Sequence, residues 1–171
     1  MIDITSATAA DQPAIEALLD AAFGSGRRNR TAYRLREGAV PLADLSWVAR
    51  DVSGIVGSLQ CWEIALRSAT DVRTPLLLLG PVAVAAGQRG AGIASAMMHR
   101  TLAAADAAGA PAILLIGDTG FYGRFGFAAG VTSGWIMPGP VDQDRLLLRG
   151  DPTALPGMAW VEGKDGLRRA A

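Results

Sequence analysis

The chain has 171 residues, of which 50% are hydrophobic and 19% are charged. This length fits one domain that can bury a sizeable core, and the hydrophobic fraction excludes a mainly disordered chain. Its 16 basic and 16 acidic residues balance, which argues against a nucleic-acid partner held by surface basicity.

The first third of the chain predicts one strand and two helices. Hydrophobic and polar residues alternate over residues 2–4, as in a strand, and residues 8–11 (Thr-Ala-Ala-Asp) match a helix capping box. Apolar residues at helical spacing predict a helix over residues 11–23 and a second over 28–36. A basic cluster surrounds the second helix: Arg27, Arg28, Arg30, Arg34 and Arg36. Such runs are usually a solvated face, and the alternative is attraction of an anionic acceptor.

The middle of the chain predicts an antiparallel hairpin and a central strand. Residues 46–50 and 55–66 have strand character and are joined at Ser53-Gly54. A nearly continuous apolar run over residues 76–84 is typical of a strand buried on both faces. Shorter strands are predicted at residues 126–127, 146–149 and 158–161.

A Gly-rich turn at residues 88–92 separates the central strand from a helix predicted over 93–108, and a buried strand follows at 112–116. Strand, turn, helix and strand make a βαβ unit, so the two strands should be parallel neighbours. The N–H groups of the first helical turn have no intrahelical partner and lie at the positive end of the helix dipole. The turn therefore predicts a phosphate-bearing ligand.

Three phosphate-binding motifs compete for this turn. A Walker A loop is excluded because the turn contains no Lys, and the dinucleotide fingerprint fails because Ser95 stands where the third glycine belongs. The third motif is Arg-x-x-Gly-x-Ala, formed by Arg89, Gly92 and Ala94. It resembles the acetyl-CoA loop of the GNAT acetyltransferase superfamily.

The resemblance extends along most of the chain. Residues 79–84 (Leu-Gly-Pro-Val-Ala-Val) precede the loop, residues 121–127 (Phe-Tyr-Gly-Arg-Phe-Gly-Phe) follow the next strand, and Gly57 lies in the hairpin. Together with Pro-Gly-Pro-Val-Asp at 138–142, these segments resemble a branch of small bacterial GNAT proteins. The resemblance implies an α+β fold with a mixed, mostly antiparallel sheet, a splayed central parallel strand pair and helices on both faces. Pro81 fits such a splay because it has no N–H to donate, although Gly80-Pro81 could instead begin a shorter strand.

The resemblance also implies acetyl-CoA as co-substrate and assigns its contacts. Backbone groups of the strand would bond the pantetheine arm, and backbone N–H groups of the turn would hold the pyrophosphate, with Ser95 adding a hydroxyl. The implied cofactor-binding residues are Val82, Ala83, Val84, Arg89, Gly90, Ala91, Gly92, Ile93, Ala94, Ser95 and Tyr122.

In this family an amine attacks the thioester directly, without an acyl-enzyme. Tyr122 matches the general-acid position, and its alternative role is packing under the sheet. The backbone N–H of Val84 is the expected oxyanion donor. The only thiol, Cys61, lies in a predicted strand and is expected to be a buried, inert residue.

The general base is left open. Residues 76–84 contain no acid, so Glu63 in the preceding strand is the candidate base. Asp118 is a second candidate that could instead cap a short helix starting near Thr119, and a water chain is a third solution. The single histidine, His99, is expected to face solvent or pack on the helix, and no metal site is predicted.

The predicted organisation is a single acetyltransferase domain over residues 1–162 with a polar tail at 163–171. The lone cysteine and apolar runs of only 11 residues predict a cytoplasmic protein without membrane partners. The predicted activity is N-acetylation of a small-molecule amine. The alternatives are a non-catalytic acyl-CoA-binding module and, with a poorer motif, a dinucleotide-dependent enzyme. A homodimer is common in the family and is an expected assembly.

Overall fold

The computed structural model describes residues 1–164, which fall into two compact units. Several strands and connections contribute to both, because the chain passes between them repeatedly. Unit 1 comprises Met1–Arg28, Pro41–Cys61 and Leu79–Gly109, and unit 2 comprises Asn29–Val40, Trp62–Leu78 and the described residues from Ala110 onward.

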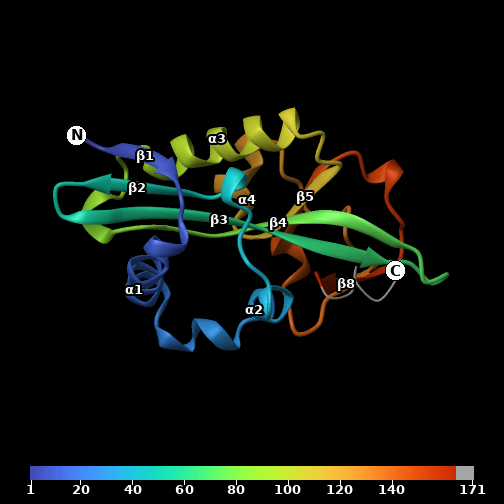
Figure 1. Cartoon of the computed structure of the whole chain (residues 1–171). Helices are drawn as coiled ribbons and strands as arrows, with labels where there is room; N and C mark the ends of the chain where they lie inside the picture. The colour runs from blue at the N-terminus through green and yellow to red at the C-terminus, as the bar shows by residue number, and fades with distance from the viewer. Residues whose placement is uncertain (165–171) are drawn as a thin grey trace. The chain divides into compact units, whose positions relative to one another are not determined.

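Unit 1 contains strands with a helix on each face. The antiparallel strands are β1 (Asp3–Ser6), β2 (Trp47–Asp51) and the first part of β3 (Gly54–Arg67), and the last residues of β4 (Arg73–Val84) also belong here. In Figure 1, α1 (Gln12–Phe23) lies below these strands and α3 (Ile93–Ala107) lies above them.

The local sequence explains how α1 is placed. Thr8 and Asp11 form the predicted capping box, and a Pro occupies the first turn, where its missing N–H costs nothing. Apolar residues on one side of α1 pack into a cluster with β2 and β4, as expected for an amphipathic helix. The buried members of this cluster are Ala7, Ile15, Leu18, Leu19, Val48 and Ala83.

The opposite face of these strands receives α3, and Gly57 in β3 permits the close approach. A Cβ atom added at Gly57 would lie 2.9 Å from Cγ2 of Ile93, 3.1 Å from Cβ of Ala49 and 3.3 Å from Cε of Met97. Farther along the helix, Arg100 donates to the backbone oxygen of Ile4 at 2.7 Å. The start of α3 is therefore pressed against β3, and its middle is tied to β1.

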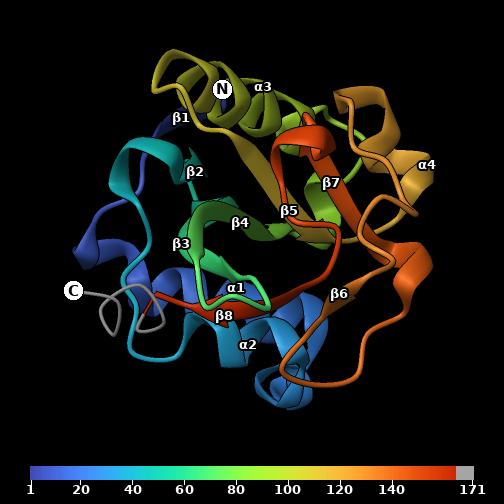
Figure 2. The ribbon, with the colours of Figure 1, turned by 90° about the vertical axis from the view of Figure 1, so that its right-hand side faces the viewer.

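Unit 2 holds the parallel strand pair. The start of β4 pairs with β5 (Ala112–Ile116) in parallel at Leu77↔Ile113 and Leu78↔Leu114, and β5 pairs antiparallel with β7 (Leu146–Gly150). Figure 2 shows β5 and β7 side by side. The end of β3 pairs antiparallel with β8 (Ala159–Gly163), which also pairs in parallel with β6 (Trp135–Ile136).

The core of unit 2 consists mainly of alternate residues of its strands, and Leu35 of α2 (Thr31–Arg36) packs into it. The hydroxyl of Thr31 donates to the backbone oxygen of Pro140 at 2.5 Å, and Arg34 donates to that of Pro138 at 2.6 Å. These bonds fasten the Pro-Gly-Pro segment to α2. The buried core comprises Leu35, Trp62, Ile64, Leu66, Leu76, Leu78, Ala112, Leu114, Trp135, Met137, Leu146, Leu148, Ala159 and Val161.

The predicted α+β class is confirmed. The strand order is β1-β2-β3-β4-β5-β7, with β8 joining β3 and β6, and most pairings are antiparallel. The hairpin, the α3 helix and the parallel pair occur as predicted. Among residues 1–164, no helix is both long enough and apolar enough to cross a membrane.

Two local predictions were wrong. No strand forms at 126–127, because Gly126 has a φ of +85° and ends a turn, and only Ala128 makes a bridge, to Leu148. The second helix is shorter than predicted, because a 3-10 turn at Ser25–Asn29 precedes α2. The alternative in which Gly80-Pro81 begins a shorter strand is excluded, because β4 already starts at Arg73. The single domain over 1–162 stays a prediction. Of the tail predicted at 163–171, only its first two residues are described, and Gly163 ends β8.

Candidate active site

The strand that leads into the Gly-rich turn changes character at Gly80-Pro81. This peptide bond is cis, and Gly80 has a φ of +121°, a conformation that side-chain-bearing residues rarely adopt. Position 81 cannot donate a ladder hydrogen bond, because proline has no N–H. Beyond it, Ala83 is buried in the α1 cluster, whereas Val82 and Val84 are half-buried. The peptide groups of residues 82–84, which were predicted to bind the cofactor, lie at the end of β4 that belongs to unit 1.

The Gly-rich turn begins at a fixed point and then becomes exposed. The N–H of Ala85 donates to the backbone oxygen of Val56 in β3 at 2.8 Å, and a 3-10 turn over Ala86–Gln88 follows. Gly90 and Gly92 have φ angles of +85° and +76°. Two left-handed positions within three residues require glycine here, because other residues adopt this conformation only at a cost.

The first turn of α3 presents backbone N–H groups that can donate hydrogen bonds to a ligand. Gly92 is the N-cap residue, and no side chain caps the helix. The first intrahelical bond runs from the N–H of Ala96 to the oxygen of Gly92, so the N–H groups of Ile93, Ala94 and Ser95 have no intrahelical acceptor. With the helix dipole behind them, these groups suit a phosphate oxygen.

Unit 2 places Tyr122 at the end of the short helix α4 (Thr119–Tyr122). Asp118 caps this helix, since its Oδ1 accepts from the N–H of Gly120 at 2.6 Å. The Tyr122 ring packs edge-on against Phe121, with centroids 4.8 Å apart, and against Gly117, where an added Cβ atom would overlap the ring. Asp118 therefore serves the capping role that the sequence offered as its alternative.

The surroundings of Tyr122 keep its phenol in the protonated form. Burial raises the pKa of its phenol above the usual value of 10.0, and the nearby Arg145 guanidinium lowers it by a smaller amount. Among residues 1–164, no group forms a hydrogen bond with its hydroxyl. The phenol is therefore neutral at physiological pH, and its proton is not shared with an acceptor in the described part of the chain.

Comparison with known protein families decides the identity of the fold. The family model described as acetyltransferase (GNAT) domain matches residues 3–130. The chain belongs to this family. The match includes β4, the Gly-rich turn, α3 and Tyr122, all of which the GNAT resemblance singled out in the sequence. A comparison of this chain's sequence with curated proteins found no match.

Solved structures share the GNAT fold. A GNAT family N-acetyltransferase (YhbS) from Escherichia coli in complex with CoA is 24% identical, with a TM-score of 0.75, and the match covers 99% of this chain and 93% of that one. A GNAT family acetyltransferase from Brucella melitensis in complex with acetyl-CoA is 23% identical, with a TM-score of 0.62 over 90% and 98% of the two chains. A protein described as histone acetyltransferase HPA2 and related acetyltransferase, from Corynebacterium glutamicum, is 24% identical, with a TM-score of 0.59 over 91% and 98% of the two chains.

The predicted GNAT site residues are divided between the two units. Val82 to Ser95 belong to unit 1, and Tyr122 and Glu63 belong to unit 2. Glu63 alternates along β3 with the buried Trp62 and Ile64, and its carboxylate lies 2.8 Å from the amine of Lys164. The candidate base is therefore held as the partner of a cation.

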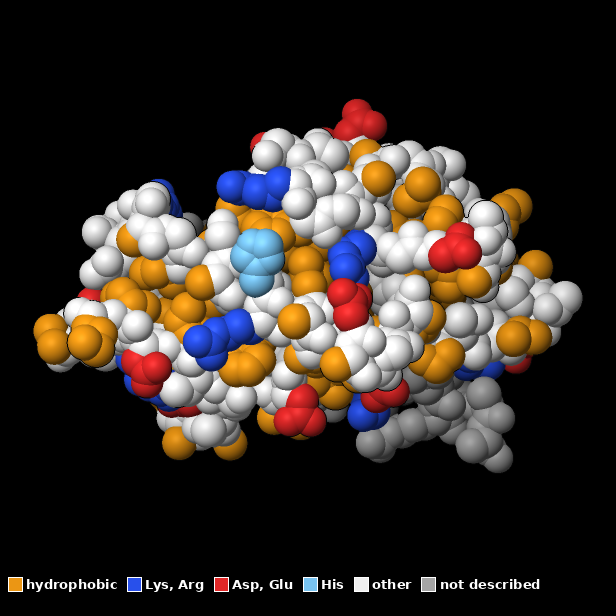
Figure 3. Space-filling view, turned by 90° about the horizontal axis from the view of Figure 1, so that it is seen from above, with side chains coloured by type: hydrophobic (Ala, Val, Ile, Leu, Met, Phe, Trp, Pro, Cys, Tyr) orange, Lys and Arg blue, Asp and Glu red, His pale blue; other side chains and the backbone are white. Residues whose placement is uncertain are grey.

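Cys61 and His99, for which the sequence predicted no catalytic role, have the predicted surroundings. Cys61 is buried, and its N–H donates to the hydroxyl of Ser46 at 3.0 Å. His99 is exposed on α3 and is the pale-blue residue in Figure 3. In the described part of the GNAT chain, no three His, Cys, Asp or Glu side chains gather where they could hold a metal ion.

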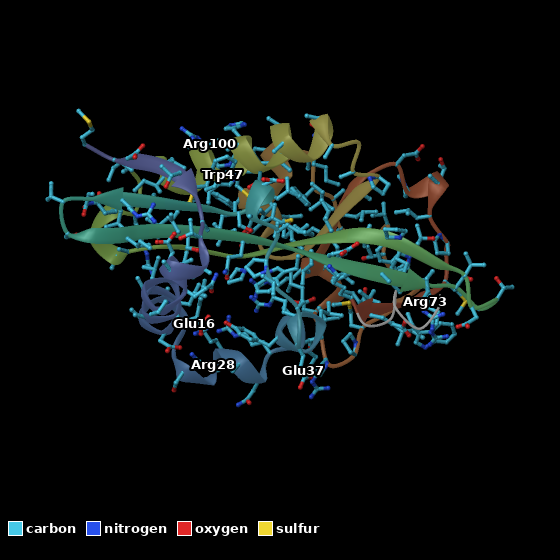
Figure 4. All side chains as sticks on the ribbon, in the orientation of Figure 1. Glu16, Arg28, Glu37, Trp47, Arg73 and Arg100 are labelled. Carbon is cyan, nitrogen blue, oxygen red and sulfur yellow. The ribbon has the colours of Figure 1, made fainter. Side chains whose placement is uncertain are left out.

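The solvated-face interpretation of the arginine cluster was wrong for two of its members. Arg27 is 1% exposed and Arg36 is 9% exposed. Arg27 binds Glu16 at 2.6 Å and Asp20 at 2.7 Å, both on α1, and Arg28 binds the same two acids. Figure 4 shows Glu16 on α1 and Arg28 just below that helix. Two arginines and two acids balance, so this part of the cluster is a charge-neutral ion network in which only Arg27 is buried.

Proposed function

We propose that the protein transfers an acetyl group from acetyl-CoA directly to a primary amine of a small-molecule acceptor. The observation that carries the proposal is the Gly-rich turn, which presents uncapped N–H groups at the start of α3 in a chain of the GNAT family. Similar folds from E. coli and B. melitensis hold CoA and acetyl-CoA. The net charge of zero favours a small-molecule acceptor over a nucleic acid.

The donor would be held mainly by backbone groups. Backbone groups of Val82, Ala83 and Val84 would bond the pantetheine amides. The N–H groups from Arg89 to Ser95 would bind the pyrophosphate, assisted by the Ser95 hydroxyl. The left-handed Gly90 and Gly92 and the uncapped helix support this assignment, because they give a polyanion room and hydrogen-bond donors.

In the proposed reaction the amine nitrogen attacks the thioester carbonyl carbon, the C–S bond breaks, and an amide and a free thiol result. The N–H of Val84 would donate to the carbonyl oxygen as negative charge develops there. Tyr122 would donate its hydroxyl proton to the leaving sulfur, since the phenol carries its proton at neutral pH. The proton that the amine loses goes to a base or to solvent and restores the phenol.

We propose Glu63 as that base, acting through water, with its carboxylate 2.8 Å from the amine of Lys164. An alkylamine with an ordinary pKa near 10.4 must lose a proton before it can attack. The ion pair lies at the surface, with side-chain exposures of 35% for Glu63 and 38% for Lys164, so solvent reaches the carboxylate.

A second candidate function is a non-catalytic acyl-CoA-binding module. Two observations favour it: residues 76–84 contain no acid, and the carboxylate of Glu63 is already engaged by Lys164. Such a module would bind CoA with the same turn and release no product.

Two measurements distinguish these functions. Stabilisation of the protein by CoA in a thermal melt tests binding, with Gly92→Ala as the disabling variant and Gly87→Ala as its control. Both positions have space for a Cβ atom, but only Gly92 requires a positive φ. An amine panel with detection of released CoA tests turnover. Binding with turnover that Tyr122→Phe abolishes is expected, and binding without turnover on every amine would establish the module.

A further inference from the structure

A side-chain hydrogen bond links the Gly-rich turn to the β2–β3 hairpin. In unit 1, the amide nitrogen Nε2 of Gln88 donates to Oδ2 of Asp51 at 3.0 Å. Asp51 ends β2, and Gln88 ends the 3-10 turn immediately before Arg89. Both side chains are half-buried, so the bond lies at the protein surface but is partly shielded from water.

The hairpin holds the acceptor of this bond in place. The other carboxylate oxygen of Asp51, Oδ1, accepts from the N–H of Ser53 at 2.7 Å and from its hydroxyl at 2.6 Å. Asp51 thus forms an Asx turn with one oxygen and holds Gln88 with the other. The hydrogen bonds of Ser53 and Gln88 lower the pKa of this carboxyl, so the acceptor stays ionised throughout the neutral range.

The rest of the turn has few restraints between Gln88 and α3. Arg89, Gly90, Ala91 and Gly92 are exposed. The N–H groups of Arg89 and Ala91 donate to local oxygens only at 3.4 Å, near the upper limit for a hydrogen bond. A glycine-rich segment loses much conformational entropy on ordering, so the point from which it leaves the protein matters.

We propose that Asp51 is a positioning residue that fixes the start of the phosphate-binding turn through Gln88, and thereby sets its affinity for CoA. This inference rests on the proposed function, in which residues 89–95 hold the pyrophosphate. The bond joins Gln88, where the turn begins, to the Asp51 carboxylate, which the hairpin holds in place. Without this bond, the N–H groups of residues 89–95 would no longer be oriented toward one ligand position.

Electrostatic repulsion and positioning predict opposite changes in CoA affinity when the charge of Asp51 is removed. A carboxylate near a polyanion site repels the ligand, so electrostatics alone predicts that removing the charge tightens CoA binding. Positioning predicts the reverse. In Asp51→Asn, the NH₂ group replaces one acceptor oxygen and faces a donor, either Ser53 or Gln88, so one of the two contacts is lost.

The first experiment measures the dissociation constant of CoA by calorimetry for wild type, Asp51→Asn and Asp44→Asn. Asp44 is an exposed acid of unit 1, so the control removes an equal charge. Asp51→Asn is expected to weaken CoA binding about three- to tenfold, as for loss of a partly exposed hydrogen bond to a charged group. Asp44→Asn should stay within about twofold of wild type.

The second experiment uses pH as a readout that a general loss of stability would not reproduce. Gln88→Glu places two carboxylates where one hydrogen bond stood, so they repel at pH 8 and can share a proton at pH 5. The ratio of variant to wild-type dissociation constants should be largest at pH 8 and fall severalfold by pH 5. A ratio that does not change with pH overturns the proposal.

Hydrogen exchange without CoA separates this inference from the proposed function. Asp51→Asn, and not Asp44→Asn, should speed exchange of the N–H groups of Ala85, Gln88 and Arg89 severalfold. If wild type binds no CoA, the proposed function fails while the exchange result still decides the positioning role. If wild type binds CoA and Asp51→Asn binds equally or more tightly with unchanged exchange, only the positioning role is overturned.

Discussion

Gly57→Ala tests the contact that places α3 against β3. The new Cβ atom would stand 2.9 Å from Cγ2 of Ile93, closer than real Cβ contacts allow, and 3.1 Å from Cβ of Ala49. The end of Met97 can move aside, but a β-branched residue in a helix has one strongly preferred χ1 angle, and Ala49 has no freedom at all. The helix must therefore retreat by a few tenths of an ångström.

The cost follows from these contacts. Overpacking of a core costs about 1–3 kcal/mol, and the smaller entropy of an alanine in the unfolded chain returns about 0.4–1 kcal/mol. The net loss is about 1–2 kcal/mol, which lowers the melting temperature by about 2–8 °C for a chain of this size. Since the same helix start forms the candidate phosphate site, CoA should also bind more weakly.

Thermal melts with and without CoA measure both effects, with Gly87→Ala as the matched control. Gly87 has no atom within 4 Å of an added Cβ and no positive φ, so its melting temperature should hold or rise slightly. Equal melting temperatures for Gly57→Ala and wild type would refute the packing argument. A destabilised Gly57→Ala protein with unchanged CoA affinity would refute the link from packing to the site.

Four further outcomes follow from the described contacts. Tyr122→Phe should lower kcat at least about tenfold with little change in melting temperature, because the phenol makes no hydrogen bond within residues 1–164; equal turnover would remove its role as acid. Because burial raises the pKa of Tyr122, its contribution to stability is complete below pH 10 and is lost as the pH rises through the folded value, so an ultraviolet titration should show a late phenolate transition that Tyr122→Phe lacks. Gly117→Ala should displace the Tyr122 ring and lower kcat while CoA affinity is retained, as separate assays of turnover and binding can show. Arg27→Ala should destabilise the fold by about 2 kcal/mol in urea titrations, clearly more than Arg28→Ala, because Arg27 is 1% exposed and Arg28 is 49% exposed in the same ion network; equal losses would contradict that ranking.

The elements that the sequence predicted correctly have strong local signals. Residues 112–116 are continuously apolar, and the helix after the Gly-rich turn is bounded by glycines at both ends. The phosphate-binding turn was predictable because its positive φ angles occur at Gly90 and Gly92, and two glycines so close together are a visible signal in the sequence.

Features that depend on distant partners were not predictable. β6 has two residues and exists only because it pairs with β8, which lies more than twenty residues later. The burial of Arg27 depends on two acids of α1 that approach it in three dimensions. The bond between Asp51 and Gln88 was missed for the same reason, although Asp51 two residues before Ser53 is a recognisable Asx-turn signature.

The repeated passage of the chain between its two units limits how the protein can be divided. The family match ends at residue 130, yet six of the fourteen buried residues described for the core of unit 2 come after it. A polypeptide ending there would lose β7 and β8, leaving unpaired edges on β5 and on the far end of β3. Exposed edges of this kind recruit other chains, so such a fragment should aggregate. The described residues after 130 are therefore a structural part of the fold, and a fragment chosen by family boundaries alone would discard them.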